Sequence, residues 1–279
     1  MTIDNVLDFS DASGSPDDER HAAERLAHVH GAGELQAVLL ALLLPPGSKR
    51  ALRAWRTETG ATSALEALRS HAANLSGAAR LPWFERLLAR MAAQPLTARQ
   101  GLLQATRRVM GARGLARPID RLHWLAMRRG LGEGAPAAVL PESYTEVGEW
   151  LESDVLSVAC VTAFLSRMVP GDGAESVGGR AWYDTVMASW SRFTDTPACA
   201  PPKAEAMVEA LARIQTLSWM QRPVIVRHWV EAAIARRRGA HLADGCADAL
   251  RLMCGLLDSP VPPELARHYI TLPADGARS

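Results

Sequence analysis

The residues of this sequence with the clearest potential for chemistry are two histidines and a glutamate near its beginning. His21, Glu24 and His28 are spaced so that they would share one face of a helix, and two imidazoles with a carboxylate can bind a metal ion. Zinc peptidases of the HExxH type need the second histidine four residues after the first, with the glutamate directly after the first histidine. This segment reads HAAERLAH, and HExxH occurs nowhere in the 279 residues. We therefore expect an exposed polar face here, with these three residues as weak metal candidates. For the whole chain we expect no catalytic residue and no cofactor.

Arginine is concentrated in one stretch of the chain, although the whole sequence is nearly neutral. Residues 86–129 hold ten arginines and a single acid, Asp120, whereas residues 142–154 hold five acids and no base. The acids could neutralise the arginines within the chain, or the arginines could form an open face for an anionic partner. Guanidinium groups suit carboxylates and phosphates. The candidate partner-binding residues are Arg107, Arg108, Arg113, Arg117, Arg121 and Arg128.

Asp154 is a third candidate, because it interrupts an apolar series. Residues from Val147 to Met168 repeat apolar side chains at helical spacing, and Asp154 occupies one of those positions. A buried carboxylate needs a partner. We expect Asp154 to be buried against an arginine, with a functional site as the alternative.

The elements that position these residues are predicted to be helices. Apolar residues recur at spacings of three and four, β-branched runs are scarce, and Gly and Pro separate the segments. We expect an all-α, two-lobed bundle of about a dozen helices, one of them over residues 142–169. The expected lobes are 17–130 and 142–272, joined by a Gly/Pro linker at 131–141, with a flexible acidic tail at 1–16 and a second tail at 273–279.

The composition limits which cellular locations and which classes of protein are expected. The chain has 31 Lys and Arg against 30 Asp and Glu, so its formal charge is +1 and gives no global attraction to nucleic acid or membrane. No apolar run reaches the ~20 residues that cross a bilayer, and the acidic start does not look like a signal peptide. The segment Leu35–Leu44, LQAVLLALLL, is predicted to be a buried core helix, with an interfacial helix as the alternative. Four well-separated cysteines predict free thiols in a cytoplasmic protein.

The sequence contains an internal repeat, and two blocks that overlap this repeat resemble a known family. Residues 97–130 and 222–258 each predict a helix that ends in Arg-Gly, at Arg113-Gly114 and at Arg238-Gly239, followed by a second helix. The block 79–131, with LPW and RRGL, and the block 232–265, with PVPP, resemble the C-terminal extension of bacterial HExxH zinc membrane peptidases of the CAAX-prenyl-protease-like class. The resemblance covers about residues 20–270.

The resemblance implies an all-helical fold with duplicated helix pairs similar to TerB, the tellurite-resistance domain. TerB-like pairs commonly carry Asp-Gly between their helices, and here Arg-Gly stands at both places, although Asp120 and Asp248 keep acids further on. This replacement argues against metal binding of the TerB kind. The peptidase motif is missing, so the sequence looks like a stand-alone tail.

The sequence therefore predicts a non-catalytic interaction or regulatory module. An acidic protein is the expected partner, an anionic membrane surface is the second and nucleic acid the third, which allows a location peripheral to the inner membrane. Two other functions stay open, namely a metal-dependent sensor or small enzyme with a site between the lobes, and a peripheral membrane or nucleic-acid adaptor.

Overall fold

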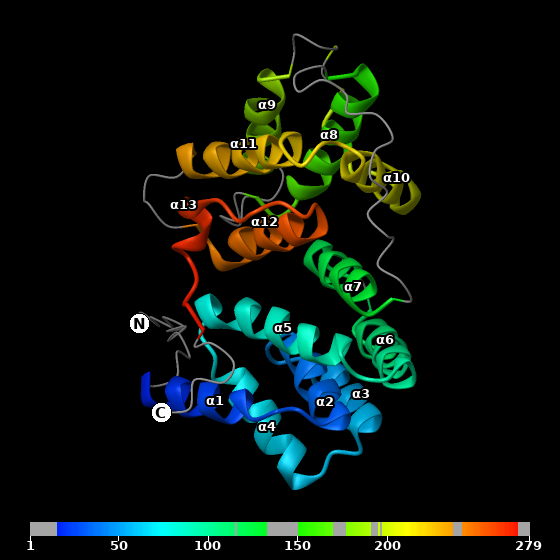
Figure 1. Ribbon diagram of the computed structural model, residues 1–279, viewed down its shortest axis with the longest axis vertical. Helices are drawn as coiled ribbons and strands as arrows, with labels where there is room; N and C mark the ends of the chain where they lie inside the picture. Colours follow the sequence, from blue (N-terminus) through cyan, green and yellow to red (C-terminus); the bar gives the residue numbers. More distant parts are fainter. Residues whose placement is uncertain are drawn as a thin grey trace, which may run out of the picture.

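The protein is described by a computed structural model that covers residues 16–114, 116–132, 150–169, 177–190, 195, 197–236 and 242–272. Within these residues all thirteen elements are helices, which confirms the all-α prediction (Figure 1). The helices are α1 Pro16–Ala27, α2 Ala32–Leu42, α3 Lys49–Thr59, α4 Ser63–Ala73, α5 Gly77–Ala92, α6 Leu96–Gly111, α7 Pro118–Leu131, α8 Glu152–Leu165, α9 Val177–Ala188, α10 Ala204–Gln215, α11 Gln221–Ala235, α12 Asp244–Leu256 and α13 Pro263–Ala266.

Helix α2 is the centre of the first group of helices. Its sequence is apolar on all sides, and a helix of that kind is stable in water only when other helices surround it. Helices α3, α4, α5 and α6 all pack on it, and α1 packs on α4. Trp55 of α3 is fully buried and donates its indole N–H to the Ala37 carbonyl at 2.8 Å. The predicted core helix at residues 35–44 is therefore present, and it ends at Leu42.

Helix α8 has the corresponding position in the second group. Residues 158–165 include buried positions on every side of the helix, and α9 and α10 pack against it. Thr162 accepts a hydrogen bond of 2.9 Å from the indole of Trp229 on α11, which fixes α11 against α8. The indole of Trp182 on α9 in turn donates to the Trp229 carbonyl at 3.3 Å.

The two groups meet mainly through α7 and α12, which pack against each other, with α5 beside them (Figure 1). Arg129 of α7 donates to the Leu256 carbonyl at the end of α12, at 3.0 Å. Ile270, near the end of the described chain, donates its backbone N–H to the Ala78 carbonyl on α5 at 3.3 Å. Side-chain and backbone contacts thus both join the groups.

Several predicted boundaries fall elsewhere. The helix expected over 142–169 begins at Glu152, because the Asp154 carboxylate accepts the Leu151 backbone N–H at 3.1 Å and so caps the helix start. Pro16, assigned to the first tail, is the first residue of α1. Residues 1–15, 133–149 and 273–279 lie outside the described residues, as does the expected Arg238-Gly239 turn.

No helix in the described part of the chain combines the length and the apolar character that crossing a membrane requires.

Candidate functional site

The turn between α6 and α7 carries a buried acid that organises the arginines around it. Gly114 has a φ of 93°, a left-handed conformation that glycine adopts without strain, and Pro118 begins α7. Asp120 is 4% exposed and accepts the Arg117 backbone N–H at 2.9 Å. The guanidinium groups of Arg113 and Arg117 lie 3.1 Å and 3.0 Å from its Oδ1 atom. Burial opposes the charge on Asp120, but its contacts with Arg117 and Arg113 outweigh burial and lower the pKa of the carboxyl.

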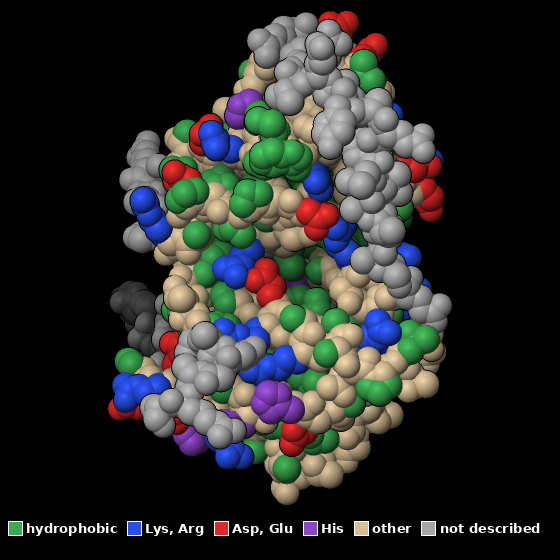
Figure 2. All heavy atoms as spheres, viewed as in Figure 1, with side chains coloured by type: hydrophobic (Ala, Val, Ile, Leu, Met, Phe, Trp, Pro, Cys, Tyr) green, Lys and Arg blue, Asp and Glu red, His purple; other side chains and the backbone are tan. Residues whose placement is uncertain are grey.

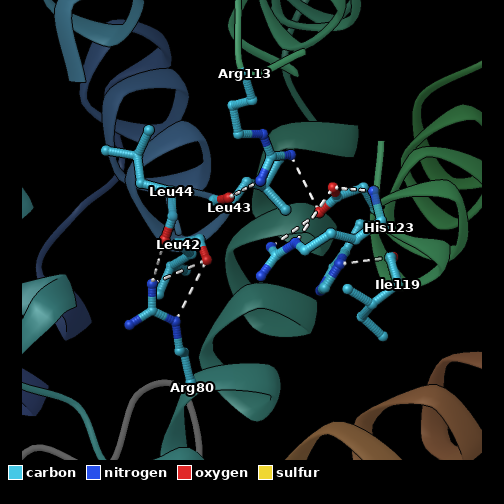
Figure 3. A network of polar contacts seen from close by, with 9 residues as sticks. Leu42, Leu43, Leu44, Arg80, Arg113, Ile119 and His123 are labelled. Atoms are coloured by element: carbon cyan, nitrogen blue, oxygen red, sulfur yellow. Dashed lines mark hydrogen bonds and ion pairs between the residues drawn. The ribbon is translucent and has the colours of Figure 1, made fainter. Parts of the chain in front are cut away.

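Arg113 also donates a hydrogen bond at the C-terminal end of the central helix α2. The last carbonyls of a helix have no partner within it and need donors from elsewhere. Arg113, whose side chain is 7% exposed, donates to the Leu43 carbonyl at 3.2 Å, and Arg80 of α5 donates to the Leu42 carbonyl at 3.1 Å (Figure 3). Burial lowers the pKa of both guanidinium groups. Arg113 therefore belongs to the core and is unavailable to a partner.

His123 lies beside this network without joining it. Its Nδ1 atom is 3.1 Å from the Ile119 carbonyl one turn earlier, and burial lowers the pKa of the imidazole to about 4 (Figure 3). The ring is accordingly neutral at pH 7, so Nδ1–H donates to the carbonyl and His123 adds no positive charge.

The six arginines proposed as one basic face separate into two sets of three. Arg108 pairs with Glu58 of α3 through contacts of 2.5 Å and 2.7 Å, and Arg113 and Arg117 share Asp120. Arg113 is 7% exposed, whereas Arg108 and Arg117 are 57% and 51% exposed but already paired with acids of the chain itself. The expectation that all six form one open face therefore needs correction. The physical reason is that Glu58, Asp120 and the end of α2 each require donors, and these arginines are within reach.

The other three, Arg107, Arg121 and Arg128, are exposed and form no ion pair with an acid in the described part of the chain. The guanidinium carbon of Arg107 lies 4.9 Å from the ring centroid of Trp124, a cation–π arrangement between α6 and α7. In Figure 2, Lys and Arg side chains gather on both sides of the junction between the two groups of helices, with acidic side chains beside some of them.

Two adjoining hollows lie along this exposed set. The first, of about 360 Å³, is lined by Gln100, Leu103, Gln104, Arg107, Trp124 and Arg128. The second, of about 440 Å³, shares Leu103 and Arg128 with the first and extends to α10 and α12. Its apolar lining consists of Leu103, Leu125, Val208, Leu211, Ala212 and Leu256. Among the described lining residues every charged side chain is an arginine, which makes these hollows the best candidate for a binding surface.

Of the acids expected to neutralise the arginine stretch, Asp154 has a different partner. Glu142, Glu146 and Glu149 lie outside the described residues. Asp154 is 3% exposed and its partner is Arg213 of α10, with Arg213 Nε 2.7 Å from Asp154 Oδ1. Asp154 therefore holds α10 against the start of α8, and its contacts account for it as a structural residue.

The histidine candidates on α1 remain exposed and apart. The rings of His21 and His71 meet edge to face with centroids 5.2 Å apart, and His28 Nδ1 is 2.8 Å from the Glu24 carbonyl. Across the described ranges, no group of three or more His, Cys, Asp or Glu side chains is arranged to hold a metal ion.

Sequence reasoning missed a second polar cluster, where α5 meets α12 and the residues after α13. Arg251 of α12 binds Glu85 of α5, with Arg251 Nε and NH2 3.0 Å and 2.7 Å from Glu85 Oε2. The same guanidinium lies 4.4 Å from the ring centroid of Tyr269, and the Tyr269 hydroxyl donates to Asp248 at 3.0 Å. Burial raises the pKa of Asp248 to about 7. The only indication of this cluster in the sequence was Asp248, because the residues that surround it come from distant segments.

Comparison with protein-family models, with curated proteins and with solved structures gave no match.

Proposed function

We propose that this protein is a non-catalytic interaction module that docks an acidic protein through Arg107, Arg121 and Arg128. The observation that carries the proposal is the division of the arginines. Arg108, Arg113 and Arg117 have carboxylate partners within the chain, whereas these three pair with no described acid, and two of them line hollows whose described lining contains no acid. Exposed guanidinium groups next to apolar surface suit a partner that offers carboxylates.

The resemblance to the TerB-like extension of membrane peptidases remains part of this proposal. Such a tail, with its duplicated helix pairs, would act in the bacterial cytoplasm by binding or regulating another protein. The division of the arginines supports the docking role without depending on that ancestry.

The test is affinity capture from a lysate of the native organism, followed by mass spectrometry. Three forms of the full chain serve as bait: wild type, the double variant Arg107→Glu with Arg128→Glu, and the control Arg227→Glu. Arg227 is an exposed arginine on α11 that lines neither hollow. Its reversal changes the surface charge away from the proposed face.

We expect wild type and the control to capture the same acidic protein, and we expect the double variant to lose it. Capture by wild type should weaken as salt is raised from 50 to 500 mM, since screening acts on exposed charges. Equal capture by all three forms would contradict the proposal.

A further inference from the structure

The two hollows form one groove with an apolar floor and a basic rim. We name it the α6–α7–α10 groove and define it by Leu103, Leu125, Leu211 and Leu256 on the floor, Arg107 and Arg128 on the rim and Val208 on its α10 side. Helix α10 packs chiefly on α8, which leaves the space between α10 and the α6–α7 pair open.

The apolar floor of the groove favours a bound segment that presents apolar side chains to it. Val208 is 51% exposed, although it is one of the larger apolar residues of α10. Covering exposed apolar surface is favourable by about 25 cal/mol per Å². The occupant must therefore present an apolar stripe, which a purely charged polymer does not have.

The rim requires acids from the same occupant. Arg107 and Arg128 bring two positive charges, and no acid lies among the described residues of the groove. A partner with carboxylates beside its apolar stripe matches both features, whereas a basic or neutral one leaves the rim unpaired.

The helices that line the groove determine which backbone conformation can bind in it. The walls are helices, whose backbone N–H and C=O groups are already bonded, and the described residues contain no strand edge to which an extended peptide could pair. A helix satisfies its own backbone and offers apolar residues at spacings of three and four.

We propose that the α6–α7–α10 groove binds an amphipathic helix of the partner protein, with its apolar stripe on the leucine floor and its acids against Arg107 and Arg128. This inference rests on the proposed docking function and adds the shape and chemistry of the docked element. Because the groove is lined by α6 and α7 on one side and by α10 and α12 on the other, the bound helix contacts both groups of helices.

The experiment is selection from a displayed library of helical peptides against the full chain. Synthetic copies of the enriched peptides are then measured by fluorescence anisotropy. The chain variants are Val208→Glu, which places a charge in the groove, and the matched control Val224→Glu. Val224 is a 41% exposed valine on α11, outside both hollows. A second pair, Arg128→Glu and Arg227→Glu, tests the rim in the same way.

We expect the enriched peptides to combine Asp or Glu with apolar residues at spacings of three and four. Val208→Glu and Arg128→Glu should each weaken their binding about ten-fold or more. The two control variants should bind like wild type.

The failures of the two proposals are distinguishable. Acidic peptides without an apolar spacing, sensitive to Arg128→Glu and insensitive to Val208→Glu, would overturn the helix and leave the acidic docking face intact. Enrichment of non-acidic peptides, or no enrichment, would overturn both.

Discussion

The α6–α7 pair has two faces that use the same residue type in opposite ways. On the inner face Arg113 is almost fully buried between Asp120 and the end of α2. On the outer face Arg107 and Arg128 line open hollows that have no acid among their described lining residues. Arginine content alone therefore does not identify a binding surface. What separates the two faces is whether helix ends and carboxylates of the chain lie within reach.

The same rule applies at the other helix ends. Arg90 donates to the Leu26 and Ala27 carbonyls at the end of α1 and to the Val29 carbonyl just after it, at 3.1 to 3.3 Å. Arg222 donates to the Leu257 carbonyl after α12 at 2.7 Å. A cation at the C-terminus of a helix complements both the unpaired carbonyls and the helix dipole. Arg90 and Arg222 therefore stabilise the ends of helices, as Arg113 does at the end of α2.

Removing the acid of the inner face should have the largest effect. Asp120→Ala takes away the carboxylate that faces Arg113 and Arg117 and the cap at the start of α7. Because Arg113 would remain buried with an uncompensated charge, we expect the free energy of unfolding to fall by about 3 to 5 kcal/mol. Guanidinium denaturation measures it. The control Asp17→Ala removes an 83% exposed acid on α1 and should change little, and a similar small change for Asp120→Ala would contradict the account.

The cluster between α5 and α12 predicts a dependence of stability on pH. Burial raises the pKa of Asp248 from 3.8 to about 7, so between these values the folded state keeps a proton that the unfolded state has lost. The contribution of Asp248 to stability should therefore be full near pH 4 and decrease as the pH rises to 7. The slope contributed by this group is about 1.4 kcal/mol per pH unit at most.

The groups around that carboxyl are Tyr269, which donates to it, Asp244, which opposes its ionisation, and Arg80 and Arg251, which favour it. Asp248→Asn cannot ionise, so its stability should lack this decrease between pH 5 and 7. Denaturation curves of both proteins at pH 5, 6 and 7 provide the measurement. A variant that keeps the wild-type slope would show that another group titrates.

A smaller loss is expected from Asp154→Ala. The change removes the 2.7 Å contact with Arg213 and the hydrogen bond from the Leu151 N–H. Arg213 is 42% exposed, so water can solvate it after the change, and we expect a loss of about 1 to 2 kcal/mol. A melting temperature equal to wild type would mean that the contact contributes nothing. A loss as large as that of Asp120→Ala would mean that the exposure of the partner arginine does not decide the cost of removing the acid.

Local features of the fold could be predicted from the sequence. The apolar segment 35–44 indicated a buried core helix, and the position of Asp154 in an apolar series indicated an inward carboxylate. Leu151 stands in the same apolar series as Asp154, yet it is 52% exposed, because α8 starts only after it.

The candidate site could be predicted only in part. Its residue type and its region were visible in the sequence, but the partners were not, because Arg113 meets Leu43 and Arg108 meets Glu58 across 70 and 50 residues of chain. Those contacts depend on how the helices pack, and helical periodicity gives no information about packing partners. For the same reason the α10 side of the groove was not predicted.

The most direct test of the account compares the unfolding free energies of Arg113→Ala and Arg128→Ala. Arg113 lies in the turn between α6 and α7 and Arg128 lies on α7, so the two variants differ mainly in whether the lost arginine has partners inside the chain. We predict that Arg113→Ala is destabilised by about 2 kcal/mol or more, since Asp120 and the end of α2 lose a donor. Arg128→Ala should stay within about 0.5 kcal/mol of wild type. Equal losses, or a larger loss for Arg128→Ala, would contradict the division between structural and binding arginines.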